Sequence, residues 1–295
     1  KRHTVLRLYP VVGHLRFLLE SFRPEIQQYF VESDTNGMPV SREFRSLIYQ
    51  RAKGVRDTRP FGTIFDVYRN GYEWVHHSLS PKDSHHIQSS VMFGDIHGTK
   101  PYQMSALNIS AMSFGSLSQN AIKALNIGAK KGGFAHNTGE GGLSPYHLEP
   151  GGDIIWQIGT GYFGCRDQQG QFDATLFQQK STLDNVKMIE IKLSQGAKPG
   201  HGGILPAVKL TEEIAKIRHV PMGKDVISPA AHSAFSSPQG LLEFVAQLRE
   251  LSGGKPVGFK LCIGNPKEFM AICKAMLESN ILPDFITIDG SEGGT

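Results

Sequence analysis

Hydrophobic and polar positions follow two alternating periods from about residue 101 onward. Short apolar runs predict strands, and segments with apolar residues three or four positions apart predict helices. Strands are expected at 107–112, 133–136, 153–158, 186–193, 256–262 and 285–289. Helices are expected at 118–131, 174–182, 211–218, 238–251 and 266–279. This alternation of strand and helix is the pattern of a parallel α/β fold.

The residues that precede two of these helices support their predicted starts. Ser237 is followed by Pro238, and Asn265 is followed by Pro266. Each pair combines a side chain that can cap a helix with a proline that fits its first position. Glu268 stands three residues after Asn265, as a capping box requires.

Six strands with intervening helices are an incomplete set for an eight-stranded (β/α)8 barrel of the TIM type. We therefore expect a barrel truncated after about strand six. The chain begins at Lys1 rather than Met and stops within a glycine loop after the strand at 285–289, which agrees with a fragment. A doubly wound open sheet is the competing fold, but the glycine loops do not match GxGxxG.

Residues 1–100 differ from the barrel region, 101–295, and we interpret them as an N-terminal accessory segment. They contain few glycines, and they predict amphipathic helices around 15–22 and 41–53. The opening KRHTVLR is basic. It fits either a solvated terminus or the cytoplasmic flank of a membrane anchor in a missing upstream part.

Composition narrows the classes of protein. The chain has 295 residues, of which 39% are hydrophobic and 20% charged, and its net charge of +4 gives no reason to expect nucleic acid as a partner. The three cysteines form no CxxC pair, so a reducing, cytoplasmic setting is expected. No apolar run reaches the roughly 18 residues of a membrane span.

Lys260 is the first candidate for chemistry. In PVGFKLCIG, apolar residues alternate with Gly258, Lys260 and Cys262. In a barrel the second set would face the interior, where a lysine is costly unless it meets an anion. A reduced flavin, which is negative at N1, fits that need. The alternative is a lysine that extends from an edge strand to water.

Three glycine-rich loops are further candidates. Glu140 in NTGEGG could hold an ammonium-like group or relay a proton, or it could be a solvated turn residue. The loop at 195–206 carries Lys198 and His201 and could be a lid, a tunnel wall or a plain surface loop. The loop at 288–295 offers backbone N–H groups for phosphate or ring contacts.

No metal site is expected. The pairs His76-His77 and His85-His86 lack supporting carboxylates, and adjacent histidines point in different directions. The cysteines lack iron–sulfur spacing.

Seven ordered motifs give the chain a family resemblance. They are SAMSFGSLS (110–118), NTGEGG (137–142), QIGTGYFG (157–164), QGAKPGHGG (195–203), ISPAAH (227–232), FKLCIG (259–264) and IDGSEGGT (288–295). In order and spacing they resemble the FMN-binding synthase domain of glutamate synthase, and the chain is most similar to the shorter, stand-alone glutamate synthase-like proteins.

The resemblance implies a barrel with FMN at its mouth and an oxidoreductase that reduces 2-iminoglutarate, formed from 2-oxoglutarate and ammonia, to L-glutamate. Lys260 and Glu140 would be the catalytic residues, with Lys260 beside the reduced flavin and Glu140 near the substrate nitrogen. The residues expected at the cofactor are Ala111, Met112, Ser113, Gln157, Lys260, Gly290, Gly293 and Gly294. Those expected at the substrate are Asn137, Glu140 and Lys198.

The chain also departs from the large enzymes. Nothing resembles their glutaminase domain, so ammonia would come from solution or, derived from glutamine, from a partner. An NADPH- or ferredoxin-linked protein or domain would supply electrons, and any iron–sulfur cluster would be bound outside this chain. His201, Asp289 and Ser291 differ from the usual family residues. The alternatives are an N-methylglutamate synthase-like enzyme and a non-catalytic flavoprotein electron relay.

Overall fold

The fold is described from a computed structural model. The structure describes residues 4–33, 37, 40–55, 62–83, 89–94, 100–197 and 202–290. The chain divides into two compact units, Lys1–Lys82 and Asp83–Thr295. Each unit is treated by itself.

The first unit is helical. It contains α1 (Thr4–Leu8), α2 (Val12–Ser21), α3 (Arg23–Ile26), the π-helical turn η1 (Gln27–Val31) and α4 (Arg42–Ala52). The two expected amphipathic helices are confirmed as α2 and α4, and the Ser41 hydroxyl caps α4 by accepting from Phe44 N at 3.4 Å. None of the helices in the described part of the chain has the length and apolarity to cross a membrane.

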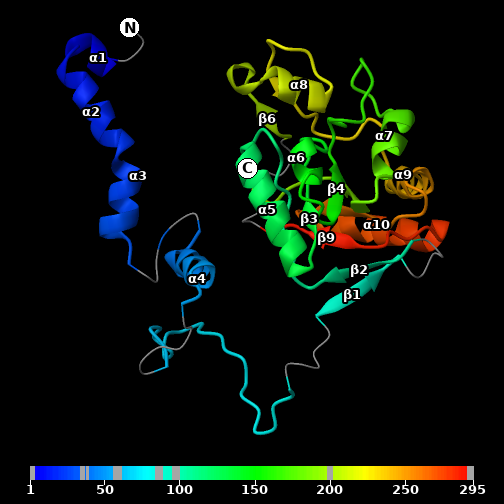
Figure 1. The fold of residues 1–295 in the computed structure, drawn as a ribbon, viewed down its shortest axis with the longest axis horizontal. Coiled ribbons are helices and arrows are strands. Elements are labelled where there is room, and N and C mark those ends of the chain that lie inside the picture. The colour runs from blue at the N-terminus through cyan, green and yellow to red at the C-terminus, as the bar shows by residue number, and fades with distance from the viewer. Residues whose placement is uncertain are drawn as a thin grey trace. The chain divides into compact units, whose positions relative to one another are not determined.

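A five-stranded parallel sheet forms the centre of the second unit (Figure 1). Its strands are β3 (His136–Asn137), β4 (Ile154–Ile158), β5 (Val186–Lys192), β8 (Val257–Leu261) and β9 (Ile286–Ile288). They lie in the order β3-β4-β5-β8-β9, which is also their order along the chain. The curled parallel sheet confirms the α/β class, and it is consistent with a truncated TIM-type barrel.

Five helices match the predicted ones, and their ends differ by one residue at most. They are α5 (Gln119–Gly132), α7 (Ala174–Ser181), α8 (Glu212–Arg218), α9 (Pro238–Leu251) and α10 (Pro266–Ser279). Both predicted caps are present, since Ser237 Oγ accepts from Gly240 N at 3.1 Å and Asn265 Oδ1 accepts from Lys267 N at 3.1 Å. Short helices α6 (Pro145–Leu148) and η3 (Ala207–Lys209) were not predicted.

The segment at 107–112, predicted as a strand, makes only an isolated parallel bridge between Ile109 and His136. It still lies beside β3, because Asn137 N donates to Ile109 O at 3.0 Å and Met112 N donates to Asn137 O at 3.1 Å. The ladder is interrupted by Asn108, whose amide bonds Ser105 O at 2.6 Å and Ala135 N at 3.0 Å. Side-chain bonds therefore replace part of the ladder here.

Two antiparallel strand pairs were also missed. One pairs β1 (Ser90–Phe93) with β2 (Tyr102–Ser105), and the other pairs β6 (Ile204–Leu205) with β7 (Val226–Ile227). The strands of the β6–β7 pair are two residues long, too short to show an alternation of apolar and polar residues. Figure 1 shows the β1–β2 hairpin at one end of the sheet, while β6 and α8 lie at the other end.

The alternation of side chains divides the sheet into two faces. Toward the helices, Trp156, Ile191 and Phe259 belong to a core shared with α7, α9 and α10. On the inner face a second apolar cluster closes the end near the β1–β2 hairpin. Its members are Ala135, Ile155 and Met188, packed against Phe93, Tyr102, Met104 and Phe285. Above this apolar layer the inner face becomes polar.

Candidate functional site

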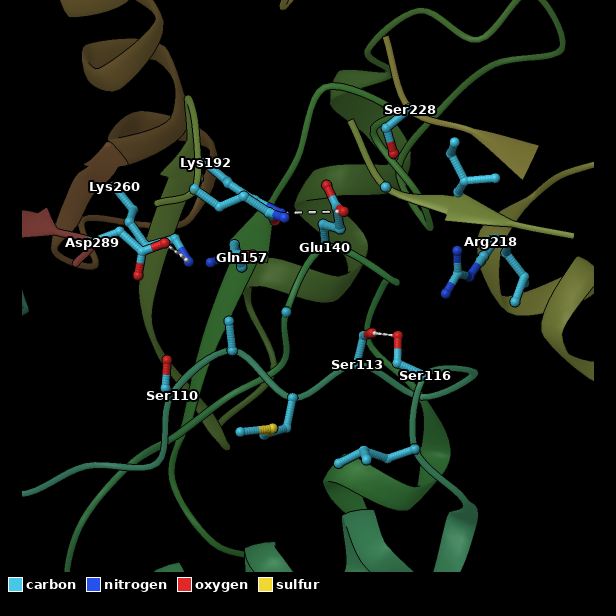
Figure 2. A pocket seen from close by; sticks show the side chains of 18 residues that line it. Ser110, Ser113, Ser116, Glu140, Gln157, Lys192, Arg218, Ser228, Lys260 and Asp289 are labelled. Carbon is cyan, nitrogen blue, oxygen red and sulfur yellow. Dashed lines mark hydrogen bonds and ion pairs between the residues drawn. The ribbon is translucent and has the colours of Figure 1, made fainter. Parts of the chain in front are cut away.

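A cavity of about 250 Å³ lies at the carboxyl ends of the parallel strands (Figure 2). Five of its 18 lining residues carry charge: the cations Lys192, Arg218 and Lys260, and the anions Glu140 and Asp289. The charged lining is therefore net cationic. Figure 2 shows the two lysines together on one side, with Arg218 on the opposite side.

Lys260 faces the interior, as its alternation with Val257, Phe259 and Leu261 predicts. Its side chain is 8% exposed, and Nζ lies 3.8 Å from Asp289 Oδ2. Gly196 N also donates to Asp289 Oδ2, at 2.9 Å. The alternative, a lysine that extends from an edge strand to water, is wrong for this side chain.

Lys192 lies on β5, two residues after Glu190, and faces the same cavity. Its Nζ is 3.2 Å from Glu140 Oε1. Burial lowers the pKa of Lys192, and the Glu140 carboxylate partly opposes that shift. Lys192 Nζ also donates to Gln195 Oε1 at 2.6 Å.

Glu140 is held in place by glycines. A Cβ on Gly159 would stand 2.7 Å from Glu140 Cβ, and one on Gly203 would meet the carboxylate itself. The side chain is 17% exposed and ion-paired, so the alternative of a solvated turn residue is wrong. The loop that follows β4 and the residue that precedes β6 thus lie directly against the Glu140 side chain.

Arg218, at the end of α8, is a buried cation on the far side of the cavity. Its Nη2 donates to Phe114 O at 3.3 Å, and its guanidinium lies 5.1 Å from the centroid of the Phe163 ring. Burial lowers its pKa. Among the described residues its Nε has no hydrogen-bond partner.

The loop of Ala111, Met112 and Ser113 borders the cavity and is held from behind by His147. His147 Nε2 lies 3.0 Å from Met112 O, and its Nδ1 lies 2.7 Å from Ser144 Oγ. Burial lowers the pKa of His147 to about 4, so the ring is neutral at pH 7. A neutral ring that donates from Nε2 and accepts at Nδ1 satisfies both contacts.

A buried polar layer lies beneath the cavity, centred on Glu190 of β5. Glu190 is 3% exposed. Its Oε1 accepts from Asn137 Nδ2 and from Gln157 Nε2, both at 2.7 Å. Its Oε2 accepts from Thr287 Oγ1 at 2.7 Å. One carboxylate thus connects β3, β4, β5 and β9.

The sequence profile of a family described as "Conserved region in glutamate synthase" matches residues 66–295, which is most of the chain. The chain belongs to the glutamate synthase family. This membership implies a flavin in the full-length protein.

Curated relatives agree with this family. The chain is 38% identical over 335 aligned residues to a "Glutamate synthase large subunit-like protein YerD" of Bacillus subtilis, covering 100% of this chain and 63% of that protein. It is 36% identical over 187 residues to an "Archaeal-type glutamate synthase [NADPH]" of Thermotoga neapolitana, covering 63% of this chain and 34% of that protein. A "Glutamate synthase [NADPH] large chain" of Azospirillum brasilense is 33% identical over 190 residues, or 62% of this chain and 11% of that protein. The chain thus spans less than two thirds of these relatives.

The structure brings most residues that the sequence singled out into one place. The cavity is lined by Ala111, Met112, Ser113, Glu140, Gln157 and Lys260. Asn137 is buried in the layer beneath it and is not a lining residue, and Gly290 follows the lining residue Asp289. Lys198, His201, Ser291, Gly293 and Gly294 lie outside the described residues, as do His85 and His86.

Sequence reasoning missed Glu190, Lys192 and Arg218. Glu190 and Lys192 alternate with Ile189 and Ile191 on β5, which is the signal that located Lys260 on β8. Arg218 gave no comparable signal. The described ends of the loop at 195–206 line the cavity through Gln195, Gly203, Ile204 and Leu205, so the plain surface-loop alternative is wrong for them.

The lining fits a flavin of the glutamate synthase family. Four buried polar atoms of lining residues have no hydrogen-bond partner among the described residues: Gln157 Oε1, Gln195 Nε2, Arg218 Nε and Ser228 Oγ. Such atoms are costly unless a ligand or water satisfies them. The described residues contain no cluster of three or more His, Cys, Asp or Glu that could hold a metal.

Proposed function

We propose that this chain contributes the FMN-binding centre of an oxidoreductase that reduces 2-iminoglutarate to L-glutamate. The observation that carries the proposal is the buried Lys260 ammonium, which faces a cavity bordered by residues 111–113 in a member of the glutamate synthase family. The five-stranded sheet would be part of a (β/α)8 barrel, whose remaining strands the rest of the protein would supply.

The reaction balances as an imine reduction. The carbonyl of 2-oxoglutarate condenses with ammonia and loses water, and the imine then gains a hydride at carbon and a proton at nitrogen. When bound, FMN supplies the hydride. A protein or domain linked to NADPH or ferredoxin would supply the electrons, and ammonia would arrive from solution or from a glutamine-hydrolysing partner.

The residues of the chain have distinct roles in this proposal. Lys260 provides a fixed positive charge for the reduced ring, whose negative charge it stabilises. Glu140, held between glycines and paired with Lys192, is suited to orient a nitrogen that carries positive charge. Arg218 is a cation suited to a carboxylate of 2-oxoglutarate. The net cationic lining supports a dianionic substrate.

The test uses the full-length protein, loaded with FMN and reduced with dithionite without oxygen. Adding 2-oxoglutarate and ammonium should reoxidise the flavin and yield L-glutamate in equal amount. Lys260→Met should slow this step, whereas Lys274→Met should not, because that lysine is on the solvent side of α10 with a side chain that is 76% exposed.

The alternatives predict different outcomes in the same assay. A methylamine-using enzyme would form N-methylglutamate and leave ammonium unused. An electron relay would be reoxidised by partner proteins and by neither amine. Absence of bound flavin would reject the proposal altogether.

A further inference from the structure

The buried carboxylate of Glu190 has a consequence for the cavity above it. An amide side chain can point either its oxygen or its nitrogen toward a ligand. Gln157 Nε2 donates to Glu190 Oε1 at 2.7 Å, so the nitrogen end of this amide is already engaged. The oxygen end of this amide is then left without a hydrogen-bond partner among the described residues, in a side chain that lines the cavity.

The Glu190 side chain is the acceptor in each of its hydrogen bonds with the described residues. Its partners are two amide nitrogens and one hydroxyl, each at 2.7 Å. Because these three donors converge on the two carboxylate oxygens, turning the Gln157 amide over would lose its bond and place its oxygen against an acceptor. Asn137 is fixed in the same sense, since its Oδ1 accepts from Gly139 N at 3.0 Å.

Gln157 Oε1 is an unused acceptor at the floor of the site. The residue is 1% exposed, and the atom has no hydrogen-bond partner among the described residues. A buried acceptor without a partner costs stability, and a ligand that brings a donor recovers it. The oxidised isoalloxazine ring has one N–H group, at N3, whereas its other ring heteroatoms only accept.

We propose that Glu190 is a positioning residue that fixes the Gln157 amide with its oxygen toward the cavity, so that the site selects a ligand edge bearing an N–H donor. The inference rests on the proposed FMN site. It adds the residue that determines whether the site binds a hydrogen-bond donor or an acceptor of the ligand. Glu190 itself does not line the cavity, and it acts through Gln157.

The test compares two ligands, FMN and N3-methyl-FMN, which lacks the N–H group. Each is titrated into the flavin-free full-length protein, and the dissociation constant is measured from the quenching of flavin fluorescence. The wild-type protein should prefer FMN by roughly fivefold, as expected for one neutral hydrogen bond.

Two variants separate the orientation of the Gln157 amide from the size and the charge of the residue at position 190. Glu190→Met removes the acceptor while keeping the side-chain length, and the preference for FMN should fall to less than about twofold. Glu190→Gln can still accept from Gln157 while donating to the Thr287 hydroxyl, so it should retain the preference. If Glu190→Met does not fold, Glu190→Asp replaces it, because it withdraws the carboxylate by one methylene and should lose the preference too.

Each result has one meaning. A preference that is lost in the Met or Asp variant and kept in the Gln variant supports the inference. Equal binding of the two flavins by the wild type overturns it while leaving the FMN site intact. A preference that survives in the Met or Asp variant, or vanishes in the Gln variant, also overturns it. A wild-type protein that binds neither flavin overturns the proposed function as well.

Discussion

Replacement of Lys260 by methionine removes one buried positive charge while preserving the length and apolar stem of the side chain. The ammonium lies within the cavity, and the nearest anion is the Asp289 carboxylate at 3.8 Å. If a reduced flavin binds there, its negative charge loses a stabilising neighbour, whereas the neutral oxidised ring loses little. The midpoint potential of the bound flavin should therefore fall.

The size of the fall follows from Coulomb's law. Two unit charges about 4 Å apart attract by about 4 kcal/mol at an effective dielectric constant of about 20. The Asp289 carboxylate also interacts with the Lys260 ammonium and partly neutralises its charge. We take this neutralisation to offset about half of the attraction between the ammonium and the reduced flavin, which leaves about 2 kcal/mol. For a two-electron couple this corresponds to about 40 mV.

The assay is equilibrium titration of the flavin absorbance against redox dyes in the holoprotein. Lys274→Met is the matched control, since it removes a lysine whose side chain is 76% exposed and should shift the potential by less than about 10 mV. A Lys260→Met potential that is unchanged or higher would refute the reasoning. The ammonium would then not lie beside the reduced ring.

Three further perturbations test other parts of the site. Glu140→Gln removes the carboxylate that holds up the pKa of Lys192, so the basic limb of a pH titration of flavin absorbance should move to lower pH. Gly159→Ala places a Cβ 2.7 Å from Glu140 Cβ and should raise the KM for 2-oxoglutarate or ammonium at least severalfold while the fold is retained, as circular dichroism would report. Burial lowers the pKa of His136 and of His147 to about 4, so each binds its proton more tightly when unfolded. Stability should therefore fall as pH drops from 6.5, by about 2 kcal/mol per histidine at pH 5 in urea unfolding.

Each of these expectations has an outcome that contradicts it. An unmoved basic limb in Glu140→Gln would show that the ion pair does not control Lys192. Unchanged KM values in Gly159→Ala would mean that the glycine is not needed to place the carboxylate. His136→Phe should lose part of the acid sensitivity, and a variant as acid-sensitive as the wild type would contradict the assignment.

Local periodicity was sufficient to predict most of the helices and strands of the second unit. It was also sufficient to turn Lys260 inward, because a strand packed against helices must alternate its faces. The same reasoning applied to 186–193 would have found Glu190 and Lys192. Local alternation is therefore present on both strands.

Other features depend on contacts between distant parts of the chain. Arg218 reaches Phe114 O from 104 positions away, and no local pattern predicts that approach. The β6–β7 pair joins two-residue strands from either side of α8, and these strands are too short to show a period. The interruption at 107–112 depends on the Asn108 amide, which replaces main-chain bonds that the apolar run alone would predict.

The apolar layer formed by Ala135, Ile155 and Met188 closes the described site at its base. Molecules that bind in this cavity would therefore share the approach from the carboxyl ends of the described strands. FMN would bind first, and each product would leave before the next reactant binds. Reductant and oxo acid would therefore take turns, and initial-rate plots at several fixed concentrations of one against the other should give parallel rather than intersecting lines.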